Sequence, residues 1–179
     1  NFCTIDLSAF YFDIRKDNLY CEPINSKKRK STIVLLNIIL NSLLKWFAPI
    51  LSFTTEEIFK LLFVDKKSIH LEKFQVLPDK FRNEKLSEKW TELIKIRNIC
   101  NISIEEKRAR KEIGSSLEAD LKIQLSQKLK DLTENTDFSE LCITSKAEVT
   151  YKDDIETTAV TCKAKGTKCP VCWKINESQ

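Results

Sequence analysis

Methionine is absent from the 179-residue chain, which also has only two glycines and one histidine. Without an initiator methionine, we expect the sequence to be a fragment of a longer protein. Two glycines are too few for a Rossmann turn and a phosphate-cradling loop, which need residues that tolerate positive φ. The sequence therefore argues against a nucleotide-binding α/β enzyme. The single histidine, His70, excludes a histidine pair as a metal site, and we interpret it as a surface residue.

Charge of one sign is not in large excess either. The chain has 30 basic and 26 acidic residues, a formal net charge of +4, so only the local distribution of charge can indicate a nucleic-acid partner. Seven cysteines are an odd number, and four of them stand singly among apolar residues. This usage favours a reducing compartment over a disulfide framework and predicts a cytoplasmic location.

Apolar residues at three- and four-residue steps predict helices in the first two thirds of the chain. We expect helices over residues 7–20, 32–53, 54–62 and 86–113, with a long connector over 64–85. Ser31 is predicted to cap the second helix, Pro49 to kink or end it, and Gly114 to cap the last one. This part of the sequence is typical of a helical bundle.

The second helix is apolar almost all round and long enough to cross a bilayer. Asn37, Asn41 and Lys45 nevertheless form a polar stripe at four-residue spacing, and three such groups would be costly in lipid. We therefore expect a buried bundle helix and no membrane association.

After Gly114 the apolar period changes from about 3.6 to 2, which predicts strands. The alternating segments are 121–125, 141–144, 149–151 and 159–163, and residues 126–132 can form a helix between the strands. The sequence therefore predicts a small α/β module after the helices.

The strongest motif is the C-x-x-C segment of Cys169 and Cys172, in which two thiolates can converge on a tetrahedral metal. We interpret it as half of a zinc site. Cys162 is a possible third ligand, with water or Glu177 in the fourth place. A thioredoxin-like redox pair and an inert tail with two exposed thiols are the alternatives.

Basic residues gather around these cysteines, and an aromatic ring follows them. Trp173 can stack on an unpaired RNA base, or it can pack over its own metal knuckle. The nearby lysines are Lys163, Lys165, Lys168 and Lys174. Two further basic clusters, residues 27–30 and the group Lys107, Arg108, Arg110 and Lys111, are weaker signals because such runs are often solvated faces.

Several segments together resemble the anticodon-binding region of bacterial-type isoleucyl-tRNA synthetase. They are residues 7–17 (LSAFYFDIRKD), 46–57 (WFAPILSFTTEE), 95–97 (KIR), 111–119 (KEIGSSLEA) and 168–173 (KCPVCW). Their order and spacing match the family over nearly the whole chain. The sequence departs from the family pattern by ending before a second C-x-x-C.

The resemblance implies a mainly α protein in three parts. These are an anticodon-binding helical bundle of the class I synthetase type over 1–114, a small α/β junction subdomain over 115–165, and the incomplete start of a zinc knuckle over 166–179. Neither the His-Ile-Gly-His nor the Lys-Met-Ser-Lys-Ser signature of the catalytic domain occurs here. The parent protein is therefore expected to be an isoleucine–tRNA ligase, and the fragment alone to be inactive.

The implied partners are tRNA(Ile) and the rest of the synthetase, which we expect to act as a monomer. Zinc is expected in the full-length protein at Cys169 and Cys172, and ATP and Mg²⁺ only in the missing catalytic domain. The candidate nucleic-acid-binding residues are Arg97, Lys107, Arg108, Arg110, Lys111, Lys168, Trp173 and Lys174. A helical protein-interaction domain without RNA binding, and the equivalent region of valyl- or leucyl-tRNA synthetase, are the alternatives.

Overall fold

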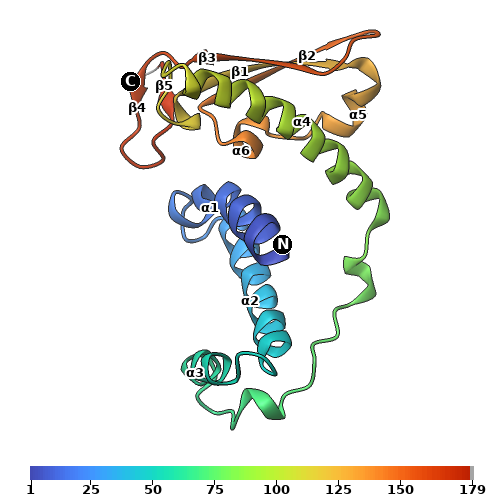
Figure 1. Ribbon diagram of the computed structural model, residues 1–179, viewed down its shortest axis with the longest axis vertical. Helices are drawn as coiled ribbons and strands as arrows, with labels where there is room; N and C mark the ends of the chain where they lie inside the picture. Colours follow the sequence, from blue (N-terminus) through green and yellow to red (C-terminus); the bar gives the residue numbers. More distant parts are fainter. Residues whose placement is uncertain (178–179) are drawn as a thin grey trace. The chain divides into compact units, whose positions relative to one another are not determined.

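The computed structural model describes residues 1–177, which divide into two compact units (Figure 1). The first unit, here the sheet unit, combines Asn1–Lys16 with the chain from Asn83 onward. The second unit, here the helical unit, is Asp17–Arg82. The chain thus leaves the sheet unit after its N-terminal helix and returns to it at the start of the longest helix.

The sheet unit contains the strands and most of the short helical turns. Its helices are η1 (Phe2–Phe12), α4 (Glu84–Ala109), η4 (Ser116–Glu118), η5 (Gln127–Leu129), α5 (Lys130–Thr133) and α6 (Phe138–Cys142). Its strands are β1 (Ala119–Ser126), β2 (Lys146–Lys152), β3 (Thr158–Lys163), β4 (Thr167–Lys168) and β5 (Ile175–Asn176). Helix α1 (Lys16–Tyr20) spans the boundary between the two units.

β1 is the central strand of a three-stranded sheet with the order β2-β1-β3. It runs parallel to β2, with Ile123 opposite Val149, and antiparallel to β3, with Ile123 opposite Ala159. Alternate residues of β1 are fully buried because the strand period is two, and they share one face of the sheet. The buried residues of this face are Ala119, Leu121, Ile123 and Leu125.

Helix α4 covers that face and completes the core of the sheet unit (Figure 1). Its buried residues Leu93, Ile96, Cys100 and Ile104 recur at three- and four-residue steps, so they form one stripe. They pack in one cluster with β1 and with Phe138, Leu141 and Cys142 of α6. A polar link reinforces this packing, because the hydroxyl of Ser103 lies 2.8 Å from that of Thr161 on β3.

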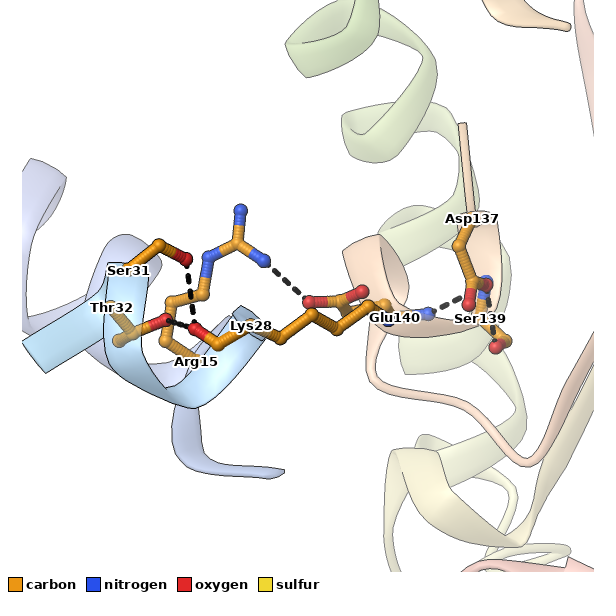
Figure 2. Close-up of polar contacts among 7 residues, drawn as sticks. All are labelled: Arg15, Lys28, Ser31, Thr32, Asp137, Ser139 and Glu140. Carbon is orange, nitrogen blue, oxygen red and sulfur yellow. Dashed lines mark hydrogen bonds and ion pairs between the residues drawn. The ribbon is translucent and has the colours of Figure 1, made fainter. Parts of the chain in front are cut away.

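The N-terminal segment is fastened to the same unit by aromatic and ionic contacts. Phe10 meets Trp90 edge-on at 6.2 Å between ring centroids, and Arg15 forms an ion pair with Glu140 of α6 (Figure 2). Asp137 caps α6, because its carboxylate accepts from the amides of Ser139 and Glu140 at 2.9 and 3.1 Å.

The helical unit consists of α2 (Lys27–Phe47), α3 (Ser52–Leu62), η2 (Ile69–Leu71) and η3 (Asp79–Phe81). Its small core joins Leu44, Ala48, Phe59 and Ile69. The carboxylate of Glu56 holds the turn before η2, accepting from the Ser68 hydroxyl and the Ile69 amide, both at 2.9 Å. The Ile69 amide is the largest cause that lowers the pKa of Glu56.

The expectation of a mainly helical chain with a small sheet is confirmed, but several local predictions are wrong. Residues 141–144 do not form a strand, because Leu141 and Cys142 end α6. Helix α4 ends at Ala109 rather than at Gly114, and Lys111 adopts the left-handed conformation at φ 58°. Ser31 does not cap α2, which begins after Ser26; its hydroxyl instead donates to the Lys28 carbonyl (Figure 2).

The prediction that α2 is a buried bundle helix, with only a narrow polar stripe at the surface, is also wrong. Within residues 1–177, Val34 remains 58% and Trp46 51% exposed, while Thr32, Ser42 and Leu44 are buried. Within its unit α2 packs against α3 and η2, and these two short helices leave much of its surface uncovered. Across residues 1–177, none of the helices combines the length and the apolar character that a membrane span requires.

The compact units also cut the chain differently from the predicted parts 1–114, 115–165 and 166–179. Helix α4 shares its core with β1, so the folded chain does not divide at Gly114. The three-part division stays a prediction about function.

Candidate nucleic-acid interface

The C-x-x-C segment forms the tip of a hairpin in which β4 and β5 pair antiparallel, with Lys168 opposite Ile175. The tip is closed by backbone hydrogen bonds from Cys169 to Lys174 at 2.8 Å and from Trp173 to Cys169 at 3.0 Å. Trp173 adopts φ 64°, a left-handed conformation that turns the chain back after Cys172. The backbone of the tip thus brings the two cysteines to the same turn.

The surroundings of Cys169 favour a thiolate. Backbone amides of Cys172 and Val171 lower the pKa of Cys169, as does the thiol of Cys172. Amides that point at sulfur and a paired second cysteine are features of one half of a tetrahedral metal site. The two cysteines therefore fit a soft divalent metal such as zinc as two of its four ligands.

In the described residues 1–177, Cys162 does not form a metal site with Cys169 and Cys172. It is exposed on β3, opposite Asp120 of β1, and no group of three or more His, Cys, Asp or Glu side chains in the described residues could hold a metal ion.

Trp173 presents its ring at the surface beside the cysteines. The side chain is 58% exposed, and the Lys168 ammonium lies 5.1 Å from the ring centroid. This cation–π contact places a positive charge against an accessible aromatic face. An exposed ring with an adjacent ammonium group can stack on a base and attract its phosphate.

Lys174 follows Trp173 and contributes a positive charge near α6. Burial raises the pKa of Asp137, but the hydrogen bonds from Ser139 and Glu140 and the positive charge of Lys174 together hold it below its ordinary value. Lys174 of the hairpin therefore interacts electrostatically with the carboxylate that caps α6.

The second candidate cluster lies at the C-terminal end of α4, where a helix dipole favours cations. Lys107 pairs with Glu112 and Arg108 with Glu105, each at 2.7 Å. Arg110 and Lys111 follow as exposed residues. The ion pairs partly neutralise the first two side chains, so Arg110 and Lys111 are the more accessible charges of the cluster.

An open depression of about 600 Å³ lies beside this end of α4. Its charged lining residues carry both signs, with three acidic and three basic side chains, and are Glu105, Arg108, Lys111, Glu112, Glu118 and Lys163. Lys163 comes from β3, so the sheet brings it beside the residues at the end of α4, which lie about fifty positions earlier in the chain. Sequence reasoning placed Lys163 near the cysteines and missed this location. The pairing of Ala119 with Lys163 accounts for it, and no local sequence pattern reports that register.

Arg97 is committed to contacts within the sheet unit. Its Nε donates to the Leu141 carbonyl at 2.9 Å, and its guanidinium group lies 5.0 Å from the Phe10 ring centroid. These contacts fasten η1 and α6 to α4. They do not favour the predicted phosphate contact, which stays a prediction.

Comparison with known proteins identifies the family of this chain. The family model of the anticodon-binding domain of tRNA ligase matches residues 1–125. The chain belongs to this family.

Relatives extend the match to nearly the whole chain. Isoleucine–tRNA ligase of Pelagibacter ubique is 64% identical over 99% of this chain, and those of Bartonella henselae and Rhodopseudomonas palustris are 39% and 38% identical over the same share. The chain spans about a fifth of the length of these relatives, 19% to 20%. The resemblance to isoleucyl-tRNA synthetase is thereby confirmed.

Proposed function

We propose that this chain is the anticodon-binding part of an isoleucine–tRNA ligase and that it binds the anticodon stem and loop of tRNA(Ile). The observation that carries the proposal is the exposed Trp173 ring under the Lys168 ammonium, on a hairpin of a chain in the anticodon-binding family. Isoleucine–tRNA ligases among the relatives favour this assignment over a valyl or leucyl enzyme.

In this proposal the hairpin reads the loop and the end of α4 contacts the backbone. Trp173 stacks on an unpaired base, and Lys168 and Lys174 neutralise nearby phosphates. Arg110 and Lys111, with Lys107 and Arg108 when their ion pairs open, contact phosphates of the stem. Phosphate contacts give affinity and orientation, and the base contact gives selectivity.

Zinc belongs to the proposal through Cys169 and Cys172. The metal would serve as a structural crosslink of the hairpin tip, and its remaining ligands would come from outside the described residues. ATP and Mg²⁺ would act in a catalytic domain of the parent ligase, which we propose to be a cytoplasmic monomer. The chain alone is then inactive, because neither catalytic signature of class I synthetases occurs in it.

A tRNA titration tests the proposal. The protein is titrated with tRNA(Ile) and with the same tRNA carrying a changed anticodon, each at two salt concentrations. Higher salt should weaken both complexes because phosphate contacts release counterions, and the anticodon change should weaken binding further. Absence of salt-dependent binding would favour the helical protein-interaction domain, and equal affinity for the two tRNAs would leave only backbone binding.

Variants separate the two clusters. Trp173→Ala should cost about 1 to 3 kcal/mol of tRNA affinity with little change in melting temperature. Trp46→Ala, which removes another exposed tryptophan, is the matched control and should leave tRNA affinity unchanged. A large loss of stability in Trp173→Ala with unchanged affinity would make Trp173 a packing residue of the knuckle.

Neutralising the cluster at the end of α4 should change the salt dependence instead. Glutamine at Arg110 and Lys111 should reduce the slope of log affinity against log salt by about one for each lost phosphate contact. Lys85→Gln, at the exposed opposite end of α4, is the control for each single substitution, because it also removes one positive charge from the helix, and it should leave the slope unchanged. An unchanged slope would assign the cluster to the helix terminus alone.

A further inference from the structure

Ser145 lies between α6 and β2 and bonds to three separate segments of the sheet unit. Its amide donates to the Ala119 carbonyl at 3.0 Å, which starts the pairing of β2 with β1. Its hydroxyl donates to the Leu117 carbonyl in η4. The same hydroxyl accepts from the Ile175 amide of β5 at 2.6 Å. One half-buried side chain thus joins the η4 turn, the sheet and the terminal hairpin.

The hairpin has little of its own to fix its orientation. β4 and β5 are two residues each, and an isolated two-stranded ribbon is marginally stable in water. At its base Gly166 adopts φ 125°, and a Cβ there would lie 2.1 Å from the Asn176 carbonyl oxygen, so the two arms approach closely. That approach closes the base of the hairpin, whereas the Ile175 bond to Ser145 ties the hairpin to the body of the unit.

Ile175 is only two residues from Trp173 and directly follows Lys174. A restraint at the Ile175 amide therefore limits how far the ring of Trp173 can swing relative to the sheet. The direction of both hydrogen bonds of the Ser145 hydroxyl is also defined. The hydroxyl has one hydrogen, which it donates to the Leu117 carbonyl, and its oxygen accepts from the Ile175 amide.

We propose that Ser145 is a positioning residue for tRNA recognition, which holds the hairpin so that Trp173 faces the anticodon loop. The expected effect of Ser145 on tRNA binding rests on the proposed function of Trp173. The hydrogen-bonded restraint itself does not depend on that function, so the two can be tested separately.

Hydrogen exchange tests the restraint in the intact protein. Ser145→Ala should speed exchange of the Ile175 amide about tenfold, as expected for loss of one hydrogen bond, while the Ile123 amide of β1 stays protected. Ser145→Thr keeps the hydroxyl and should restore slow exchange. Ser145→Cys, a weaker partner of similar size, should be intermediate, and it tests the same bond if the alanine variant does not fold.

Ser103→Ala is the matched control. The Ser103 hydroxyl also makes two bonds between elements of the sheet unit: it shares a hydrogen bond with the Thr161 hydroxyl and accepts one from the Thr161 amide. Its loss should weaken the contact between α4 and β3 but leave the exchange of Ile175 within about twofold of the parent, because that amide exchanges through local opening of the hairpin. Equal acceleration at Ile175 in both variants would overturn the proposal.

A double-mutant cycle on tRNA affinity tests the consequence. If Ser145 acts through Trp173, Ser145→Ala should weaken tRNA binding in the parent protein, Ser145→Thr should restore it, and Ser145→Ala should have no further effect in Trp173→Ala. Additive losses would overturn the positioning role. If Trp173→Ala alone leaves tRNA affinity unchanged, the proposed base contact fails, and the exchange experiment still decides whether Ser145 orients the hairpin.

Discussion

The sheet unit and the helical unit differ in how they bury apolar residues. In the sheet unit, one helix stripe and alternate strand residues meet in a single cluster, with Leu121, Ile123 and Leu125 at 1% exposure or less. The helical unit has a core of only Leu44, Ala48, Phe59 and Ile69. Apolar side chains such as Phe53, 93% exposed, lie outside that core.

This difference shows that apolar content alone does not make a core. Helix α2 is among the most apolar segments of the sequence, yet few of its residues are buried because its unit offers few surfaces to cover them. Helix α4 is far more polar, yet its narrow stripe is buried against a sheet. We therefore expect the helical unit to open at lower free energy than the sheet unit, since local stability follows buried apolar contacts.

Phe59→Ala should have the largest effect on this comparison. Phe59 is 1% exposed and contacts Phe63 at 4.9 Å between ring centroids, so truncation should cost about 3 to 5 kcal/mol. Hydrogen exchange should show α2 and α3 opening while β1 stays protected. Phe53→Ala should change stability by less than about 0.5 kcal/mol. Simultaneous opening of β1 would mean that the two units unfold together.

Leu121→Ala is the converse test, because it should destabilise the sheet unit and leave the helical unit unchanged. Leu121 is 1% exposed at the centre of the sheet unit's core, and its truncation should cost about 2 to 5 kcal/mol. Denaturant unfolding followed at α4 should shift to lower midpoint, with α3 amides unaffected. Val160→Ala, at an exposed position of β3, is the control and should cost much less.

Asp137→Ala should have a smaller effect, confined to the sheet unit. Loss of the cap of α6 should cost about 1 kcal/mol, and Asp137→Asn should retain most of it, because asparagine also caps helices. Thermal unfolding measures both variants. An equal loss in the two would mean that the charge of Asp137, and not its hydrogen bonds to Ser139 and Glu140, stabilises α6.

The acid dependence of the helical unit should be the smallest effect. Because the pKa of Glu56 is lowered in the folded protein, its stabilisation is complete above the ordinary carboxyl pKa and is lost as pH falls through the lowered value. Unfolding of α3 should therefore become easier in acid, and Glu56→Gln should flatten that dependence. Glu57→Gln, an exposed neighbour, should not. Identical acid profiles for parent and Glu56→Gln would contradict this role.

Periodicity predicted the existence of the long helices and three of the sheet strands, because side-chain spacing reports directly which face of an element is apolar. It did not predict their ends. Gly114 was expected to stop α4, but Lys111 takes the left-handed position, since hydrogen bonds of the last turn and the contacts of the following loop determine the end of a helix. Residues 141–144 alternate like a strand, yet Asp137 caps a helix there.

The sequence by itself determined the family, the two cysteines of the C-x-x-C segment and the aromatic residue beside them, because these depend on residue types at short fixed spacings. Tertiary structure decided the contacts between residues that are far apart in the sequence. It committed Arg97 to Leu141 and Phe10, brought Lys163 to the end of α4, and placed the Ser145 hydroxyl between Leu117 and Ile175. Strand register and helix packing determine these contacts, and neither is encoded in the neighbouring residues of the chain.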